Sequence, residues 1–376
     1  MDKVRSAILG CSKVAHTYAK ALTTLEGAEL AAVWNRTETK AREFAGQYGV
    51  RAYADIETMV RREGIRMAVV CNAHPFHAEA ALPAIRAGAH VLVEKPLAAT
   101  LADCDAMISA AKAAGVLLGS IAQRRWYAPV QRVRRAIDEG RIGRPILGIA
   151  QLLGWRSEAY YRTDAWRGTW EQEGGGVLVN QAPHQIDLLQ WFMGPVEELA
   201  GSWANLNHPT IEVEDTAVAA LRFRGGALGC IVASNSQNPA LFGKVWVHGQ
   251  NGATVGVQTD GGAMFIAGMT TITEPPVNDH WTVPGEEHLL DQWRKEDADF
   301  FRRIPATEYY HRLQVEDFLQ AIREGRPPAV AGEEGRKTVE IFTAIYRAQR
   351  DGKSIRFPLA SETGRADLDG RRGGTD

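Results

Sequence analysis

The chain has 376 residues, of which 45% are hydrophobic and 23% charged, and its formal net charge at pH 7 is -2. This length exceeds what one hydrophobic core usually supports, so the sequence predicts two domains. A nearly neutral charge without a basic stripe argues against nucleic-acid binding, and no apolar run approaches the ~18 residues of a membrane-spanning helix.

The cysteines and the first residues bear on the compartment. Cys11, Cys71, Cys104 and Cys230 are scattered and no two form a CxxC pair. We therefore expect reduced thiols, a cytoplasmic protein and no metal site. The apolar stretch 7–11 superficially resembles a lipoprotein cleavage site, but it is far shorter than a signal-peptide core. We expect it to form a buried strand instead.

The first third of the chain alternates apolar strands with helical patterns. Strands are expected at 4–9, 28–34, 67–71, 90–93 and 116–121, and helices at 15–25, 38–48, 78–87 and 101–114. Thr37 and Thr100 are the expected N-caps of two of these helices, and Gly49 is an expected C-terminal stop. This alternation predicts a parallel, doubly wound sheet, so we assign a Rossmann dinucleotide-binding domain to residues 1–122.

The pattern changes after a helix expected at 130–139. Short strands joined by turns predict a mostly antiparallel sheet, with strands at 145–154, 197–205, 216–223, 227–234, 244–249 and 254–257. Residues 274–305 show no clean period and are expected to form a long loop, whereas 309–324 and 334–351 read as amphipathic helices. We therefore assign an α+β domain to residues 123–360 and a disordered tail to 361–376.

A degenerate nucleotide-binding turn follows the first predicted strand. Gly10 and Ala15 occupy the first and third positions of a GxGxxG/A motif, with Lys13 and Val14 between, but Ser12 replaces the second glycine. The Ser12 hydroxyl can donate to a phosphate, although its Cβ narrows the approach. The strand–turn–helix context favours a dinucleotide site over a tight turn without a ligand.

The end of the second predicted strand bears on the choice between NAD and NADP. Asn35 and Arg36 stand where NAD-binding proteins often carry an acidic residue for the ribose hydroxyls. Arg36 suits a 2′-phosphate, but it is equally compatible with a solvated strand-end charge. The sequence leaves this preference open.

Two further segments carry chemistry. Glu94-Lys95-Pro96 closes a buried strand, so Lys95 is expected at the mouth of the ligand crevice of an open α/β sheet. Downstream, three glycines at 174–176 precede a helix expected to begin near Asn180 and to present His184 with Asp187 one turn on. His184 is then either a proton-transfer residue or a structural histidine satisfied by Asp187, and Asn180 is either functional or simply an N-cap.

Taken together, these motifs resemble the glucose–fructose oxidoreductase / inositol dehydrogenase / MocA family, from residue 4 to about 359. The matching segments are 10–16, 71–77, 87–91, 94–96, 174–187, 213–215, 314–318 and 334–336, with Trp191 and Gly194.

The resemblance implies a hydride transfer between NAD or NADP and a carbinol carbon of a cyclic sugar, sugar derivative or inositol. It implies that Lys95 and His184 meet at the reacting carbon, that Lys95-Pro96 is often a cis bond, and that Asn180 orients a hydroxyl. It also implies a homo-oligomer, a dimer or tetramer, with the open face of the second-domain sheet as the interface. The cofactor residues expected are Gly10, Ser12, Lys13, Val14, Asn35, Arg36, Asn72, His74, His77, Glu94, Lys95 and Gln123, and the substrate residues are Lys95, Arg124, Trp126, Arg156, Arg162, Trp166, Arg167, Asn180 and His184.

Two departures from the family pattern matter. Asn180 stands where the family often has an aspartate, and an amide cannot accept a proton, so a carboxylate–histidine relay at this point is in doubt. Asn72-Ala73-His74 replaces a more usual Thr-Pro-Asn. Two rival functions remain: an NAD-dependent glycosidase on the same scaffold, in which the redox step is transient, and a ligand sensor that keeps the nucleotide pocket without catalysis.

Overall fold

The computed structural model describes residues 3–260, 274–364 and 367. It divides into two compact units, which we describe separately: 1–123 with 307–336, and 124–306 with 337–376. The first boundary falls within a residue of the expected one. The segment 307–336 departs from the contiguous division, because it packs with the first unit although it follows the second in sequence.

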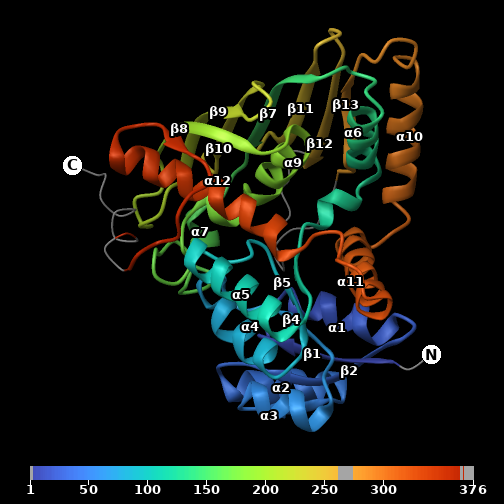
Figure 1. Ribbon diagram of the computed structural model, residues 1–376, viewed down its shortest axis with the longest axis vertical. Coiled ribbons are helices and arrows are strands. Elements are labelled where there is room, and N and C mark those ends of the chain that lie inside the picture. The colour runs from blue at the N-terminus through green and yellow to red at the C-terminus, as the bar shows by residue number, and fades with distance from the viewer. Residues whose placement is uncertain (1–2, 261–273, 365–366, 368–376) are drawn as a thin grey trace. The chain divides into compact units, whose positions relative to one another are not determined.

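The first unit is a parallel sheet of six strands in the order β3-β2-β1-β4-β5-β6 (Figure 1). In this doubly wound order the strands are added on one side of β1 first and then on the other side, beginning with β4. Sheets of this kind bind their ligands at the point between these two strands. The strands are β1 (Val4–Leu9), β2 (Ala28–Trp34), β3 (Arg51–Tyr53), β4 (Met67–Val70), β5 (His90–Val93) and β6 (Leu118–Ser120).

Helices cover this sheet, and the one that arrives from far along the chain completes its core. In α11 (Ala306–Glu324), Val315, Phe318, Leu319 and Ile322 share one helical face and pack with Tyr18 of α1 (Ala15–Thr24). Figure 1 shows α11 beside α1. The other helices of this unit are α2 (Glu38–Tyr48), α3 (Ile56–Glu63), α4 (His77–Arg86) and α5 (Leu101–Ala114).

Local capping agrees with the sequence in part. The Thr100 hydroxyl accepts from the Asp103 amide at the start of α5, and Gly49 ends α2 with φ 67°. Thr37 is the N-cap residue of α2, as expected, but its side chain makes no capping hydrogen bond. The sequence also gave no indication of β3 or α3.

The second unit contains, among the described residues, an eight-stranded sheet in the order β13-β12-β11-β7-β10-β9-β8-β14. Its neighbours are antiparallel except for the pair β10 and β7, so the predicted mostly antiparallel sheet is confirmed. The strands are β7 (Pro145–Leu153), β8 (Val196–Ala204), β9 (Thr216–Phe223), β10 (Leu228–Ser234), β11 (Phe242–Gly249), β12 (Thr254–Asp260), β13 (Val277–Trp281) and β14 (Ile355–Arg356).

One face of this sheet packs on helices: α9 (Pro183–Met193) contacts β7 and β11, and α6 (Ala128–Asp138) contacts β12. The segment 274–305 is not one long loop as expected, because it contains β13 and α10. Most of the predicted disordered tail 361–376 lies outside the described residues. The helices are α6 (Ala128–Asp138), α7 (Glu158–Tyr161), α8 (Val177–Asn180), α9 (Pro183–Met193), α10 (Leu289–Phe301) and α12 (Gly332–Asp351).

None of the helices in the described ranges combines the length and the apolar character that crossing a membrane requires.

Candidate functional site

The carboxyl ends of β1 and β4 form the first part of the site. Gly10 has φ +102°, and a Cβ at this position would lie 2.5 Å from the Asn72 backbone nitrogen. Only glycine fits such a close approach of the two turns. The buried Ser12 Oγ and Asn72 Oδ1 have no hydrogen-bond partner.

Unpaired buried polar atoms are unusual unless a ligand satisfies them, so this edge fits a dinucleotide with its pyrophosphate at the start of α1. Gln123 Oε1 is a third such atom in this unit. Val14 is the N-cap residue of α1 and has no side-chain cap, whereas Lys13 is exposed to solvent. The turn thus offers backbone N–H groups and a hydroxyl to a phosphate.

Asn35 and Arg36 lie at the end of β2 as expected, but with partners inside the protein. The Asn35 amide accepts from the Cys11 N–H at 3.0 Å and donates to the Thr37 carbonyl at 3.0 Å. Its side chain therefore braces the nucleotide turn. The Arg36 guanidinium lies 4.2 Å from the Phe76 ring centroid and 3.8 Å from the Glu79 carboxylate, and it is half exposed.

His77 and Glu94 fix the backbone around Lys95. The buried His77 ring faces the Pro96 carbonyl at 3.0 Å and the Asn72 carbonyl at 3.0 Å, and burial lowers its pKa. His77 thus connects the ends of β4 and β5. His74 is buried one turn earlier, with its ring 5.9 Å from that of His77.

Glu94 is buried and accepts from the Tyr18 hydroxyl at 2.5 Å and from the Lys95 amide at 2.9 Å. The direction in which Lys95 leaves β5 is thus set by a carboxylate tied to α1. The Lys95–Pro96 peptide bond is cis, as the resemblance implied.

The second part of the site is the glycine segment that precedes α8. A Cβ on Gly175 would lie 2.4 Å from the Tyr346 hydroxyl, and one on Gly176 would lie 1.8 Å from the Glu214 carbonyl. The glycines therefore let this segment pass against α12 and the residues before β9.

Glu214 anchors this segment, and sequence patterns gave it no role. Its buried carboxylate accepts from the amides of Gly176 at 2.9 Å and Leu178 at 3.0 Å and from the Tyr346 hydroxyl at 2.9 Å. Burial raises the pKa of Glu214 to about 7, against the opposing effect of these three donors. Glu214 thereby positions the helical turn that carries Asn180.

Asn180 is the last residue of α8, not the N-cap of the following helix, so the capping interpretation was wrong. Its amide nitrogen donates to Glu173 Oε1 and to the Tyr160 hydroxyl, the latter at 3.3 Å. Glu173 is 1% exposed and also accepts from the Gly168 amide at 2.5 Å. A buried carboxylate therefore lies beside Asn180, the residue that stands where the family often has an aspartate.

His184 lies in the first turn of α9 and is half-buried. Asp187 does not satisfy it: both carboxylate oxygens of Asp187 accept from Arg125, at 2.9 Å from Nε and 2.6 Å from Nη2. Arg125 also lies 4.9 Å from the Trp191 ring centroid. The ion pair fixes the first half of α9. Because Arg125 binds both oxygens of Asp187, the interpretation of His184 as a histidine bound to Asp187 is wrong.

The expected substrate residues separate into distinct environments. Arg124 forms a bidentate pair with Asp260, which also accepts from Gln185 Nε2 at 3.0 Å. Arg167 lies against the Tyr160 and Trp166 rings, 4.3 and 4.4 Å from their centroids, whereas Trp126 is half-buried. Arg162 is exposed and paired with Glu158 at 2.6 Å, so nothing in its contacts joins it to the Asn180 cluster.

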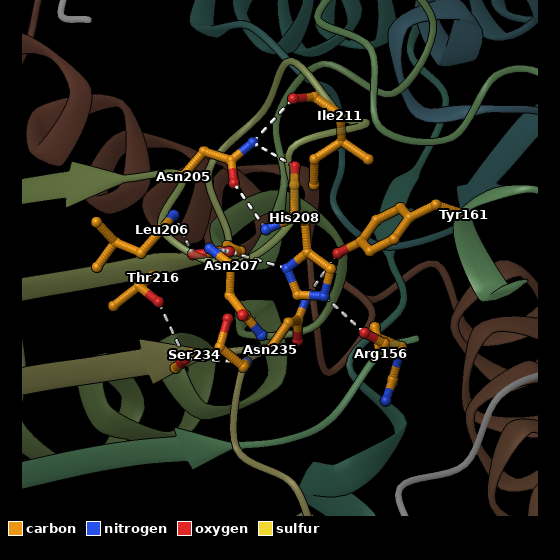
Figure 2. Close-up of polar contacts among 12 residues, drawn as sticks. Arg156, Tyr161, Asn205, Leu206, Asn207, His208, Ile211, Thr216, Ser234 and Asn235 are labelled. Atoms are coloured by element: carbon orange, nitrogen blue, oxygen red, sulfur yellow. Dashed lines mark hydrogen bonds and ion pairs between the residues drawn. The ribbon is translucent and has the colours of Figure 1, made fainter. Parts of the chain in front are cut away.

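Figure 2 shows a buried network that holds the backbone of Arg156. His208 Nδ1 lies 2.8 Å from Asp215 Oδ2, and His208 Nε2 lies 2.7 Å from the Arg156 carbonyl oxygen. Burial opposes charge on His208, but these two acceptors raise its pKa. Burial likewise opposes charge on Asp215, but donors that include His208 and the amides of Asn207 and Leu206 lower its pKa to about 2.

A depressed pKa of Asp215 predicts the sign of a pH effect. Its carboxylate stabilises the fold by about 2 kcal/mol at pH values above its ordinary pKa, and this contribution is lost as the pH falls through about 2. We expect Asp215→Asn to lower the free energy of unfolding by roughly this amount at neutral pH and to weaken the loss of stability on acidification. Denaturant unfolding at a series of pH values measures both effects, with Asp291→Asn, 96% exposed, as the control. An unchanged acid dependence in Asp215→Asn would contradict the assignment.

The first unit thus carries an edge that fits a dinucleotide, and the second unit carries a helix with a half-buried histidine in its first turn. Residues 4–121 match the model of the oxidoreductase family with an NAD-binding Rossmann fold, and residues 130–255 match the C-terminal domain model of the same family. The chain belongs to the glucose–fructose oxidoreductase / inositol dehydrogenase / MocA family, and its first domain is an NAD-binding Rossmann domain.

The chain is similar to known proteins and to solved structures over almost its whole length. Myo-inositol 2-dehydrogenase of Thermotoga maritima is 27% identical over 94% of this chain and 98% of its own length. The 1,5-anhydro-D-fructose reductase of Ensifer adhaerens is 29% identical over 93% and 97%. The WlbA dehydrogenase of Bordetella pertussis, solved in complex with NADH and UDP-GlcNAcA, is 30% identical with a TM-score of 0.83, and the match covers 96% of this chain and 99% of that one.

Proposed function

We propose that this protein is an NAD(P)-dependent dehydrogenase of a cyclic sugar, sugar derivative or inositol. The observation that carries the proposal is the placement of Lys95 by Glu94 and His77 at the carboxyl end of β5, in the unit whose nucleotide turn has unpaired polar atoms. The names of the relatives, a myo-inositol dehydrogenase and an anhydrofructose reductase, support the substrate class.

The side chains divide the remaining work of the reaction. The bound nicotinamide supplies or accepts the hydride. Lys95 donates a hydrogen bond to the reacting oxygen and stabilises its developing negative charge, while His184 exchanges the hydroxyl proton. Asn180 orients a neighbouring hydroxyl, with its rotamer fixed by Glu173 and Tyr160. This scheme needs only one proton acceptor, so the amide at position 180 is compatible with it.

The test of the proposal is nicotinamide absorbance with NAD and with NADP against inositols, free sugars, anhydrosugars and glycosides. Turnover of a cyclic polyol or sugar supports it and settles the cofactor preference that Arg36 leaves open. Release of a sugar from a glycoside without net change in absorbance would instead support an NAD-dependent glycosidase. Cofactor binding without turnover of any member would favour a sensor.

We further propose that the protein assembles as a dimer or tetramer through the outer face of the second sheet. Strand register brings small and apolar side chains onto this face: Val218 pairs with Ser202 and Val232, and Ala220 pairs with Ala200 and Cys230. Val218 is 48% exposed, Leu228 is 50% exposed, and the face is hollowed by a cavity of about 810 Å³. A broad apolar face of this kind is typical of subunit interfaces.

Val218→Arg tests this interface. A buried, unpaired guanidinium at the centre of an apolar contact costs several kcal/mol, so we expect the variant to dissociate. Because Val218 is half exposed in the single chain, the fold of the chain itself is expected to remain intact. Analytical ultracentrifugation measures the mass of wild type and variant. A monomeric wild type, or a variant with wild-type mass, would contradict the proposal.

A further inference from the structure

Arg156 is a buried arginine whose main chain is fixed from two sides. It is 4% exposed; its N–H donates to the Asn235 carbonyl at 3.0 Å, and its carbonyl oxygen faces the His208–Asp215 pair. Figure 2 shows the carbonyl turned towards His208 while the side chain extends away from it. The network of buried polar groups therefore presents this guanidinium in one direction.

Among the described residues, no carboxylate forms an ion pair with this guanidinium, although Asp260 is near enough to affect its charge. Three other buried or partly buried arginines of this unit are bidentate to a carboxylate: Arg124 to Asp260, Arg125 to Asp187 and Arg132 to Asp297. Arg156 Nη1 donates to the Trp155 carbonyl at 2.8 Å, and its buried Nε has no partner. Burial lowers the pKa of Arg156, although nearby Tyr160, Tyr161 and Asp260 oppose this. An uncompensated buried cation is costly unless an anion arrives to pair with it.

Arg156 lies close to the residues that precede α9, the helix that carries His184. Its guanidinium lies 5.3 Å from the Tyr160 ring centroid, and the Tyr160 hydroxyl accepts from Asn180 Nδ2 and Gln181 Nε2, each at 3.3 Å. Asn180 and Gln181 lead directly into the turn that bears His184. Arg156 thus stands one side chain away from the residues that we assign to the reacting hydroxyls.

We propose that Arg156 binds a carboxylate of the substrate, so that this enzyme acts on an acidic sugar of the uronate class. The inference rests on the proposed dehydrogenase function. Arg124 and Arg167 each pair with a carboxylate of the protein, Asp260 and Asp164, so Arg156 is the one of these three arginines that no carboxylate contacts. The partnerless Nε lies on the edge of the guanidinium that forms side-on bidentate pairs with carboxylates.

The experiment compares acids with their neutral isosteres on the full chain. Calorimetric titration with D-glucuronate and D-galacturonate, each against its amide, is carried out with the wild type, Arg156→Gln and Arg156→Lys. We expect the wild type to bind one acid ~10–100-fold more tightly than its amide, the usual range for a charge-assisted pair. We expect this ratio to fall to about one in Arg156→Gln and to be partly retained in Arg156→Lys. Arg144→Gln removes an exposed arginine of the same unit and is expected to keep the wild-type ratio.

The thermal midpoint separates a ligand-binding role from a structural one. Because Gln removes an uncompensated charge, the midpoint of Arg156→Gln without ligand is expected to equal or exceed that of the wild type. A marked fall of the midpoint, or an acid-to-amide ratio equal in wild type and Arg156→Gln, would overturn the inference. So would a wild type with no preference for either acid.

The experiments can reject the dehydrogenase function and the carboxylate site at Arg156 independently of each other. Cofactor reduction by neutral polyols without any preference for acids leaves the dehydrogenase standing and removes the carboxylate site. Binding of an acid that depends on Arg156, without nicotinamide reduction by any sugar, keeps the site and removes the dehydrogenase.

Discussion

Replacement of Lys95 by alanine is expected to lower kcat by ~10²–10⁴-fold while leaving the affinity for the nicotinamide nucleotide nearly unchanged. The reason is that the lysine ammonium interacts with the charge that develops on the substrate oxygen, and this interaction is strongest in the transition state. The Glu94 carboxylate holds the backbone amide of residue 95, so we expect the turn to persist in the variant. Steady-state kinetics together with a titration of the bound nucleotide measure both quantities.

A matched control removes a lysine of the same unit that has no part in the site. Lys112 is 70% exposed and paired with Glu333 at 3.1 Å, so Lys112→Ala is expected to retain the wild-type rate. Lys95→Arg keeps the positive charge but changes its geometry, and we expect it to recover little activity. A wild-type rate in Lys95→Ala would remove the lysine from the chemistry.

Replacement of His184 by alanine is the second large effect, a loss of ~10²–10⁴ in kcat. His184 lies at the start of α9, whose base is fixed independently by the Arg125–Asp187 pair, so the helix is expected to stay in place. The rate–pH profile distinguishes a proton-transfer residue from a structural one. We expect the rate of the wild type to have a titrating limb that His184→Ala lacks.

The control for this variant is His280→Ala, because His280 is an exposed histidine on β13 of the same unit. It is expected to keep both the rate and the pH profile of the wild type. If His184→Ala lowers the rate but leaves the shape of the pH profile unchanged, the histidine does not transfer the proton.

Periodicity predicted the elements that are buried on a regular face. The strands β1, β2 and β5 are rich in buried apolar residues, and each has the bounds expected from sequence. By contrast, β13 reads Val-Asn-Asp-His-Trp, a strand at the edge of its sheet that needs no apolar alternation. The sequence of residues 274–305 did not predict this strand, because it has no period that distinguishes a strand from a loop. The packing of α11 in the first unit was not predictable either. Its amphipathic pattern predicts a helix with one buried face but does not indicate which unit that face packs against.

The site was predictable where one residue type performs a task at a known place in the fold. Gly10 is required by the approach of Asn72, and Lys95 follows from the end of a buried strand. The partners of these residues were not predictable, because they come from distant segments. Glu173 reaches Asn180, and Glu214 reaches the amides of Gly176 and Leu178, only once the glycine segment has folded back.

Spacing on a helix gave one misleading pairing. Asp187 lies three residues after His184, which is a favourable separation for a contact, yet a guanidinium from outside the helix competes for the carboxylate. A bidentate arginine pair is stronger than a single hydrogen bond from an imidazole, so Arg125 binds both oxygens. The sequence contains Arg125 but nothing that places it beside α9.

The most direct test of the proposed function follows the hydrogen atom itself. The sugar or polyol that gives turnover is prepared with deuterium at the oxidised carbinol carbon, and the reduced nucleotide is examined by NMR. The proposed function predicts deuterium at C4 of the nicotinamide in the released nucleotide, with a lower rate of turnover than with the unlabelled substrate. A released nucleotide that carries no deuterium, or a protein that reduces neither NAD nor NADP with any cyclic sugar or polyol, would contradict it.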